Sequence, residues 1–174
     1  MKQAGILLLA LLMCLAAAGA ETAPEGMTYL LEAEDGRYVA LTLPPGFGPF
    51  RPDTETTDIP FTYAADQPQT GCRVQVQLSL ETQKDQQIAL RKVRDPANGI
   101  RVWEDMTIGD HVFLVYTGRA WTNEWHFLRR TKDGYDARFC YTMPEEQEEM
   151  PREALDILAT LRIIPAEAIE NAAE

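Results

Sequence analysis

The run DHVFLVYTGRAWTNEWHFLRRTKDGYDARFCYTMP, residues 110–144, carries the strongest structural signal in this chain. Three segments rich in β-branched and aromatic residues alternate in it with short segments rich in Gly, Thr, Asn and Asp. This composition is typical of strands joined by tight turns. It predicts an antiparallel meander of three strands, over His111–Thr117, 124–130 and 135–142.

The turn at residues 132–134 allows two registers for the last hairpin. A two-residue turn sets Arg129 opposite Arg138. A three-residue loop with a left-handed glycine sets Arg130 opposite Asp136 instead. Opposite charges stabilise a ladder and like charges destabilise it, by about 0.2–1 kcal/mol per pair. We therefore predict the three-residue loop.

The predicted register also decides which side chains face each other across the hairpin. It forms the aromatic pairs Trp125–Tyr141 and Phe127–Phe139. It sets His126 directly opposite Cys140, on the face that also carries Leu128 and Arg138. A thiol beside an imidazole can form a thiolate–imidazolium couple, so this pair is the sharpest candidate for catalysis in the chain.

Hydrophobic periodicity extends the prediction outward from the meander. Residues 72–80 alternate strictly between apolar and polar side chains, which is typical of a strand with one dry face. The other expected elements are strands over 38–43, 60–65 and 100–106, and helices over 82–94 and 151–162. We expect residues 21–36 to lead into the fold and residues 44–59 to form a long loop.

The order of these elements resembles the PsbP-like fold, which the photosystem II extrinsic protein shares with a Ran-binding nuclear import factor. The residues that carry the resemblance are YVALTLPPGF (38–47), the meander at 110–144 and ALDILATLRI (154–163). The resemblance implies an α+β domain with a compact, largely antiparallel sheet of about six strands and helices on both faces. It also implies an adaptor or accessory protein and not an enzyme. No binding motif of that family matches here residue by residue.

The first 20 residues have the pattern of a cleaved secretory signal peptide. Lys2 supplies a positive charge, an apolar run covers residues 6–15, and residues 18–20 offer small side chains for cleavage. The run is shorter than the roughly 20 residues of a membrane-spanning helix. Cys14 suggests a lipoprotein as an alternative, but Met13 is larger than the residue that lipidation requires there. We expect a secreted, periplasmic or otherwise extracytoplasmic protein.

Length and charge restrict the class of partner. Lys2 is the one basic residue in the signal segment, so the remaining chain has 15 basic and 27 acidic side chains and a net charge of −12. Its length suits a single domain over 21–165, followed by a flexible acidic tail over 166–174. A chain this acidic repels nucleic acid and anionic membrane surfaces. We expect neither as a partner.

Two cysteines, Cys72 and Cys140, remain after the signal segment. Export allows a disulfide between them, because oxidising compartments let disulfides persist. Closing so long a loop would stabilise the fold by on the order of 4 kcal/mol. The number of cysteines alone leaves both the bonded and the free state open.

The sequence excludes several enzyme classes more firmly than it supports any. The single serine, Ser79, lies within a predicted strand, whereas a serine hydrolase needs its hydroxyl on an exposed turn. The two histidines, His111 and His126, are too few and too far apart to form a zinc motif. The glycines at 46 and 48 precede no helix, so no phosphate-binding loop is present. We expect no cofactor and no metal.

Clustered carboxylates are a further candidate for chemistry. Glu104 with Asp105, or Asp53 with Glu55 and Asp58, could bind calcium or act as acid and base. A calcium site brings several oxygens together in a tight loop that contains glycine, and neither cluster has such a loop. We interpret both clusters as solvated surface.

Our leading hypothesis is a non-catalytic exported domain that binds a protein or cell-envelope ligand. Aromatic and basic side chains on loops are the candidates for ligand binding, namely Phe47, Phe50, Trp121 and Arg119. The alternative is a small envelope enzyme that uses a thiol site at Cys140 and His126, or surface carboxylates.

Overall fold

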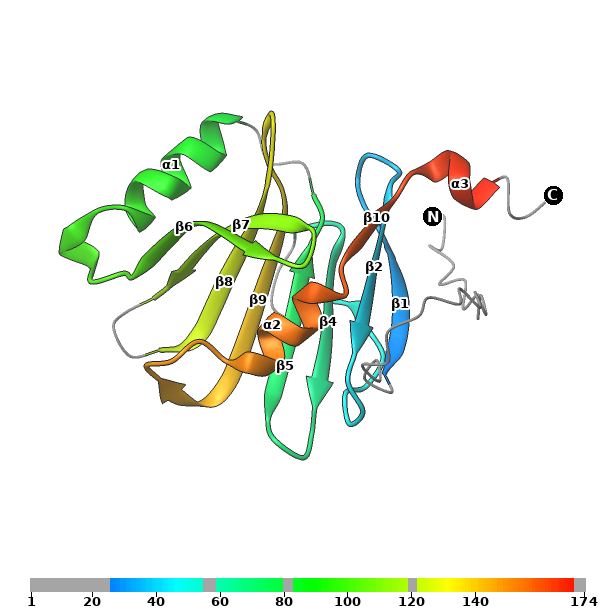
Figure 1. Ribbon diagram of the computed structural model, residues 1–174, viewed down its shortest axis with the longest axis horizontal. Coiled ribbons are helices and arrows are strands. Elements are labelled where there is room, and N and C mark those ends of the chain that lie inside the picture. Colours follow the sequence, from blue (N-terminus) through cyan, green and yellow to red (C-terminus); the bar gives the residue numbers. More distant parts are fainter. Residues whose placement is uncertain (1–25, 55–58, 80–82, 119–121, 171–174) are drawn as a thin grey trace.

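The computed structural model describes residues 26–54, 59–79, 83–118 and 122–170. These residues form ten strands, three α-helices and one short 3-10 helix (Figure 1). The helices are α1 (Gln83–Val93), α2 (Arg152–Ala159) and α3 (Ala166–Glu170), and the 3-10 helix covers Pro96–Asn98. The predicted helices over 82–94 and 151–162 are therefore confirmed to within a few residues.

The strands form two antiparallel sheets. The larger sheet contains, in spatial order, β3 (Arg51–Pro52), β4 (Thr62–Gln67), β5 (Cys72–Gln77), β9 (Gly134–Gln147), β8 (Thr122–Thr131), β7 (His111–Thr117) and β6 (Val102–Ile108). The smaller sheet contains β1 (Met27–Glu32), β2 (Tyr38–Leu43) and β10 (Arg162–Ile164), in that order. We call the face of the larger sheet that carries Phe127 and Phe139 the inner face, and the face that carries His126 and Cys140 the outer face.

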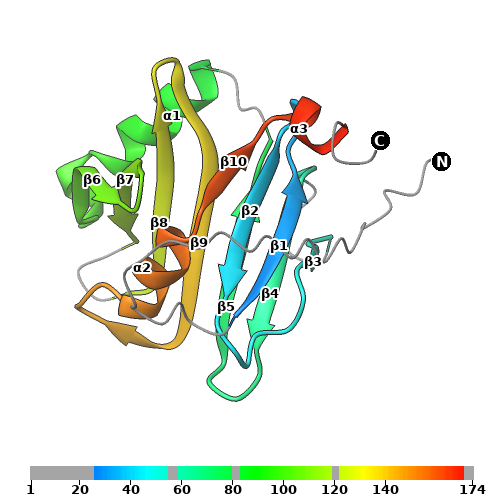
Figure 2. The ribbon, with the colours of Figure 1, turned by 45° about the vertical axis from the view of Figure 1, so that its right-hand side comes forward.

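The prediction of one sheet with helices on both faces is wrong, and the chain is mostly β. The smaller sheet and α2 cover the inner face of the larger sheet, with β1 and β2 beside β4 and β5 (Figure 2). Only α1 lies against the outer face, and none of the side chains described for it is buried. Helix α1 therefore does not provide the helical layer that was predicted for this face.

The smaller sheet arises where no sheet was expected. Residues 27–32 were predicted to lead into the fold, but they form β1, with Tyr29 opposite Leu41 of β2. Strand β10 is three residues long and pairs Ile163 with Val39, more than a hundred residues earlier in the chain. A three-residue strand has too few positions to show a local periodicity.

The meander follows the predicted register over most of its length. Trp125 lies opposite Tyr141, Phe127 opposite Phe139, and His126 opposite Cys140. The predicted pair of Arg130 with Asp136 is wrong, because a β-bulge shifts the register after Arg129. Arg130 lies opposite Tyr135, which leaves Asp136 as the extra residue of the bulge.

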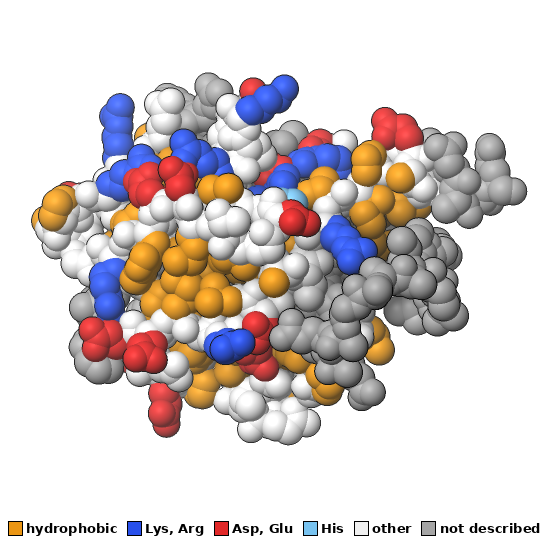
Figure 3. Space-filling model, viewed as in Figure 1, with side chains coloured by type: hydrophobic (Ala, Val, Ile, Leu, Met, Phe, Trp, Pro, Cys, Tyr) orange, Lys and Arg blue, Asp and Glu red, His pale blue; other side chains and the backbone are white. Residues whose placement is uncertain are grey.

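The hydrophobic core lies between the inner face, α2 and the smaller sheet. Trp125, Phe113 and Phe127 are completely buried in it, and α2 contributes Ala154 and Ile157. Apolar side chains also gather on the side of the molecule shown in Figure 3. The partly buried residues that pack on the core include Trp103, Met106, Met150 and Leu155.

Residues 166–170, where we expected a flexible tail, form α3, and residues 171–174 lie outside the described residues. The predicted signal peptide, residues 1–20, also lies outside them. Within the described part of the chain, the helices are too short or too polar to cross a membrane.

Candidate functional site

A row of polar side chains crosses four neighbouring strands on the outer face. Gln75 of β5 lies opposite Cys140 of β9, Cys140 lies opposite His126 of β8, and His126 lies opposite Tyr116 of β7. Strand residues two apart share a face, so Glu124 joins His126 on this side of the sheet. Such a rigid row fixes the relative positions of its side chains.

His126 is the centre of this row. Its ring stacks on that of Tyr116, with 4.7 Å between the ring centroids and 18° between the planes. Its Nε2 lies 3.6 Å from Oε2 of Glu124, and its Nδ1 lies 3.5 Å from Nη2 of Arg138. The side chain of His126 is 11% exposed. Its orientation is therefore set from both ring nitrogens and from one ring face.

The contacts of His126 shift two pKa values. Burial lowers the pKa of His126, but hydrogen bonds with Cys140 and Glu124 outweigh burial, so that its pKa is raised above the ordinary value. The hydrogen bond with His126 lowers the pKa of Glu124, with help from the positive charge of Arg138 and against the effect of burial. Glu124 is therefore ionised at neutral pH.

Cys140 is a free thiol that only small molecules and ions can approach. It is 7% exposed, and its Sγ lies 3.8 Å from Oγ1 of Thr142. The possible disulfide with Cys72 does not form. Cys72 shares the inner face with Val74, so the two sulfurs are on opposite sides of the sheet and their Cβ atoms point apart.

Three potential metal ligands come together at this point. The carboxylate of Glu124, a ring nitrogen of His126 and Sγ of Cys140 all lie within 4.8 Å of one another. The sequence predicted that His126 and Cys140 are cross-strand neighbours, but it did not identify Glu124 as the third member of the cluster. The signal that could have found it is the two-residue spacing to His126 along a strand.

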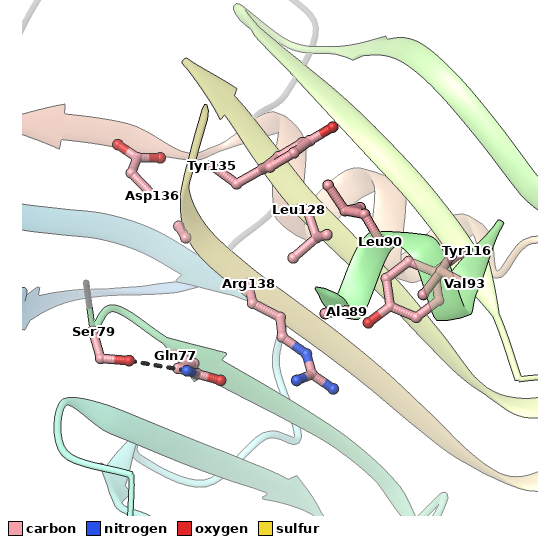
Figure 4. A pocket seen from close by; sticks show the side chains of 11 residues that line it. Gln77, Ser79, Ala89, Leu90, Val93, Tyr116, Leu128, Tyr135, Asp136 and Arg138 are labelled. Carbon is pink, nitrogen blue, oxygen red and sulfur yellow. Dashed lines mark hydrogen bonds between the residues drawn. The ribbon is translucent and has the colours of Figure 1, made fainter. Parts of the chain in front are cut away.

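A cavity of about 60 Å³ lies beside this row, between α1 and the outer face. Its apolar walls are Ala89, Leu90 and Val93 of α1 and Leu128 of β8. Its polar lining includes Gln77, Ser79, Asp136 and Arg138 (Figure 4). Cys140 and His126 do not line the cavity, but Tyr116 and Arg138, which both contact His126, do.

Arg138 is the unusual residue of this cavity. Figure 4 shows its side chain reaching from β9 into the space between Gln77 and α1. Its Nε is buried and has no hydrogen-bond partner. Within the described residues no carboxylate forms a salt bridge with it. Asp136, which also lines the cavity, is instead bound by Arg37 and Arg129.

The aromatic and basic residues predicted to bind a ligand do not form one site. Phe50 is 5% exposed and packs edge-on against Tyr29, so it belongs to the core and offers no binding surface. Phe47 also packs against the core. Trp121 and Arg119 lie outside the described residues.

The predicted carboxylate clusters are divided among salt bridges. Asp53 is buried and binds Arg73 at 2.9 Å, while Glu55 and Asp58 lie outside the described residues. The other pair is also occupied, since Glu104 binds Arg94 and Asp105 binds Arg130. Every described carboxylate of the two clusters thus has an arginine partner.

Comparison of this chain with protein-family models, with curated protein sequences and with solved structures finds no match.

Proposed function

We propose that this protein is an exported binding domain that takes up a small monocarboxylate with an apolar body in the cavity beneath α1. The observation that carries the proposal is Arg138, which lines a partly apolar cavity with its Nε buried and unpartnered and with no salt bridge to any carboxylate of the described residues. The signal-peptide pattern of the first 20 residues supports export.

The charge of Arg138 requires compensation. A guanidinium stays protonated at every physiological pH, and Arg138 is only partly exposed, so a counter-charge bound in the cavity would stabilise it. The long contact with Nδ1 of His126 engages only one of its five N–H groups. A bound carboxylate would accept two parallel hydrogen bonds from the guanidinium and neutralise its charge.

The surrounding charges favour a carboxylate over a phosphate. Of the described lining residues, Arg138 is the one arginine, and Asp136 belongs to the same lining. A phosphate would bring a second negative charge close to Asp136 and into a chain of strongly negative net charge. Ser79 accepts a hydrogen bond from Gln77 at 2.9 Å, which leaves its own hydroxyl proton for a ligand oxygen.

The size of the cavity restricts the ligand further. On this measure a water molecule occupies roughly 10–15 Å³, so the cavity of about 60 Å³ holds a carboxylate and a few carbons. The aliphatic walls from α1 and Leu128 suit such a short apolar body. Larger ligands would extend past α1 into solvent.

Butyrate is a suitable probe. We expect its titration into the isotope-labelled protein to shift the amide resonances of residues 135–138 and of α1, with a Kd on the order of 1 mM. Butanol, which lacks the charge, and inorganic phosphate should bind at least roughly tenfold more weakly, a difference of about 1.4 kcal/mol.

Three variants test the site. Arg138→Gln should abolish butyrate binding, and Arg91→Gln, on the exposed side of α1, should leave it unchanged. Ala89→Phe should block the cavity while leaving Arg138 in place, which tests the site even if the Arg138 variant folds poorly. Binding that survives both Arg138→Gln and Ala89→Phe, or phosphate binding as tight as that of butyrate, would overturn the proposal.

A further inference from the structure

We propose that Glu124, His126 and Cys140 bind one zinc ion on the outer face of the larger sheet. These residues do not line the cavity beneath α1, so the ion would not occupy the carboxylate site, although Arg138 borders both.

The spacing of the donor atoms suits zinc. At the usual zinc bond lengths of about 2.0–2.3 Å, the ligand atoms of a tetrahedral site lie roughly 3.3–3.6 Å apart. Nε2 of His126 and Oε2 of Glu124 are 3.6 Å apart, and all three donor atoms lie within 4.8 Å of one another. The side chain of Glu124 is 52% exposed, so it is free to rotate the small remaining distance.

The sheet holds the side chains of His126 and Cys140, and the backbone of Glu124, in place before any ion arrives. His126 and Cys140 are direct cross-strand neighbours, and the ring of His126 is fixed by its stacking on Tyr116. The backbone at Glu124 is held from both sides by Thr122, whose Oγ1 lies 3.0 Å from the Glu124 nitrogen and 3.2 Å from its oxygen. Two of the three ligands are thus preorganised and lose little conformational entropy when they bind an ion.

The donor types select the metal. A thiolate and an imidazole favour zinc and other transition metals, whereas magnesium and calcium take oxygen ligands. The thiolate of Cys140 and the carboxylate of Glu124 together neutralise a divalent cation. Three protein ligands leave the fourth position of a tetrahedral zinc ion to water or to another small ligand.

Among the described residues, Arg138 is the positively charged side chain that contacts this cluster, and its contact must adjust. Arg138 donates to Nδ1 of His126, so the proton of the neutral ring lies on Nε2, facing Glu124. Zinc bound at Nε2 moves that proton to Nδ1, and the 3.5 Å contact opens. The thiol of Cys140 gives its proton to solvent, so zinc affinity should fall as the pH is lowered.

Cobalt(II) gives a direct readout, because a cobalt–thiolate bond produces a charge-transfer absorption in the near ultraviolet. We expect titration of the reduced protein with cobalt(II) to give this band with one ion per chain, and zinc to displace it. Cys140→Ser should abolish the band. Cys72→Ser is the matched control and should keep it, since Cys72 lies on the inner face.

Two further variants test His126 and Glu124 as ligands. His126→Asn and Glu124→Gln should each weaken zinc binding by roughly tenfold or more, whereas Glu145→Gln, on the exposed end of β9, should not. Glu124 is largely exposed, so its variant should fold even if the Cys140 variant does not.

Two results would overturn the zinc site. One is the absence of a cobalt–thiolate band in the parent protein, and the other is a band that disappears in Cys72→Ser but remains in Cys140→Ser. Removing zinc with a chelator should leave butyrate binding intact, so that failure of one proposal does not imply failure of the other.

Discussion

His126 lies in surroundings that favour its protonated form over the neutral one. Burial and the charge of Arg138 oppose protonation, but hydrogen bonds with Cys140 and Glu124 outweigh both, and the pKa in the folded chain is raised. The unfolded chain keeps the ordinary pKa of about 6.5. The protonated ring therefore stabilises the fold fully below about pH 6.5, and this contribution is lost as the pH rises through the folded pKa.

The first prediction follows from the upward shift of the His126 pKa. Without metal, the stability lost in His126→Asn should be larger at pH 6 than at pH 9, because each unit of raised pKa is worth about 1.4 kcal/mol of stability. Urea denaturation of both proteins at the two pH values, with a chelator present, measures the difference. An equal loss at both values, or a larger one at pH 9, would contradict the raised pKa of His126.

At the scale of single residues, the sequence predicted partners across the hairpin but not the contacts along it. Cross-strand pairs such as His126 and Cys140 were predicted correctly from turn length and charge pairing. The three-residue loop behind that prediction is wrong, because Thr131 pairs with Gly134 around a two-residue turn and the bulge at Asp136 supplies the extra residue. That no described carboxylate forms a salt bridge with Arg138 depends on where α1 lies over the sheet, which no local pattern encodes. Phe50 shows the opposite error, since its place in a Pro- and Gly-rich segment suggested exposure while the smaller sheet buries it.

Strand β9 pairs with β5 and β8 in the larger sheet and also contacts the smaller sheet's side of the molecule through Asp136. The bulge at Asp136 directs this carboxylate to Arg129 of β8, with 2.9 Å between Oδ1 and Nε, and to Arg37, with 2.8 Å between Oδ2 and Nη1. Arg37 lies between the first two strands of the smaller sheet. One carboxylate thus joins the two sheets, which is why the simple pair with Arg130 does not form.

The second prediction concerns this junction. Asp136→Asn should lower the free energy of unfolding by roughly 3 kcal/mol, because it leaves the nearly buried Arg129 without its counter-charge. Asp35→Asn is the control, since Asp35 binds Arg37 near the surface and its loss should cost less than about 1 kcal/mol. Equal costs in chemical denaturation would show that Asp136 does not link the sheets.

For the molecule as a whole, the sequence predicted most strands but not how they divide into sheets. Strand β2 was expected, yet both of its partners were missed, because β1 looked like a leader and β10 is three residues long. Pairing between β2 and β10 is decided by the burial of residues such as Val39 and Leu41 against the core. Such long-range packing leaves no periodic signal in either segment.

The last prediction tests the separation of the two faces of the larger sheet. Cys72 and Cys140 lie on opposite faces, so the folded protein should not form a disulfide between them even in an oxidising buffer. The folded protein is incubated in a glutathione redox buffer, and its free thiols are then alkylated in denaturant without any reducing agent. Mass spectrometry of the digested chain should find no peptide that links the two cysteines. The same treatment of chain first unfolded in urea is the control, because the unfolded chain can bring the two thiols together. A linked peptide from the folded protein would require one of the two strands to turn its opposite side to the core.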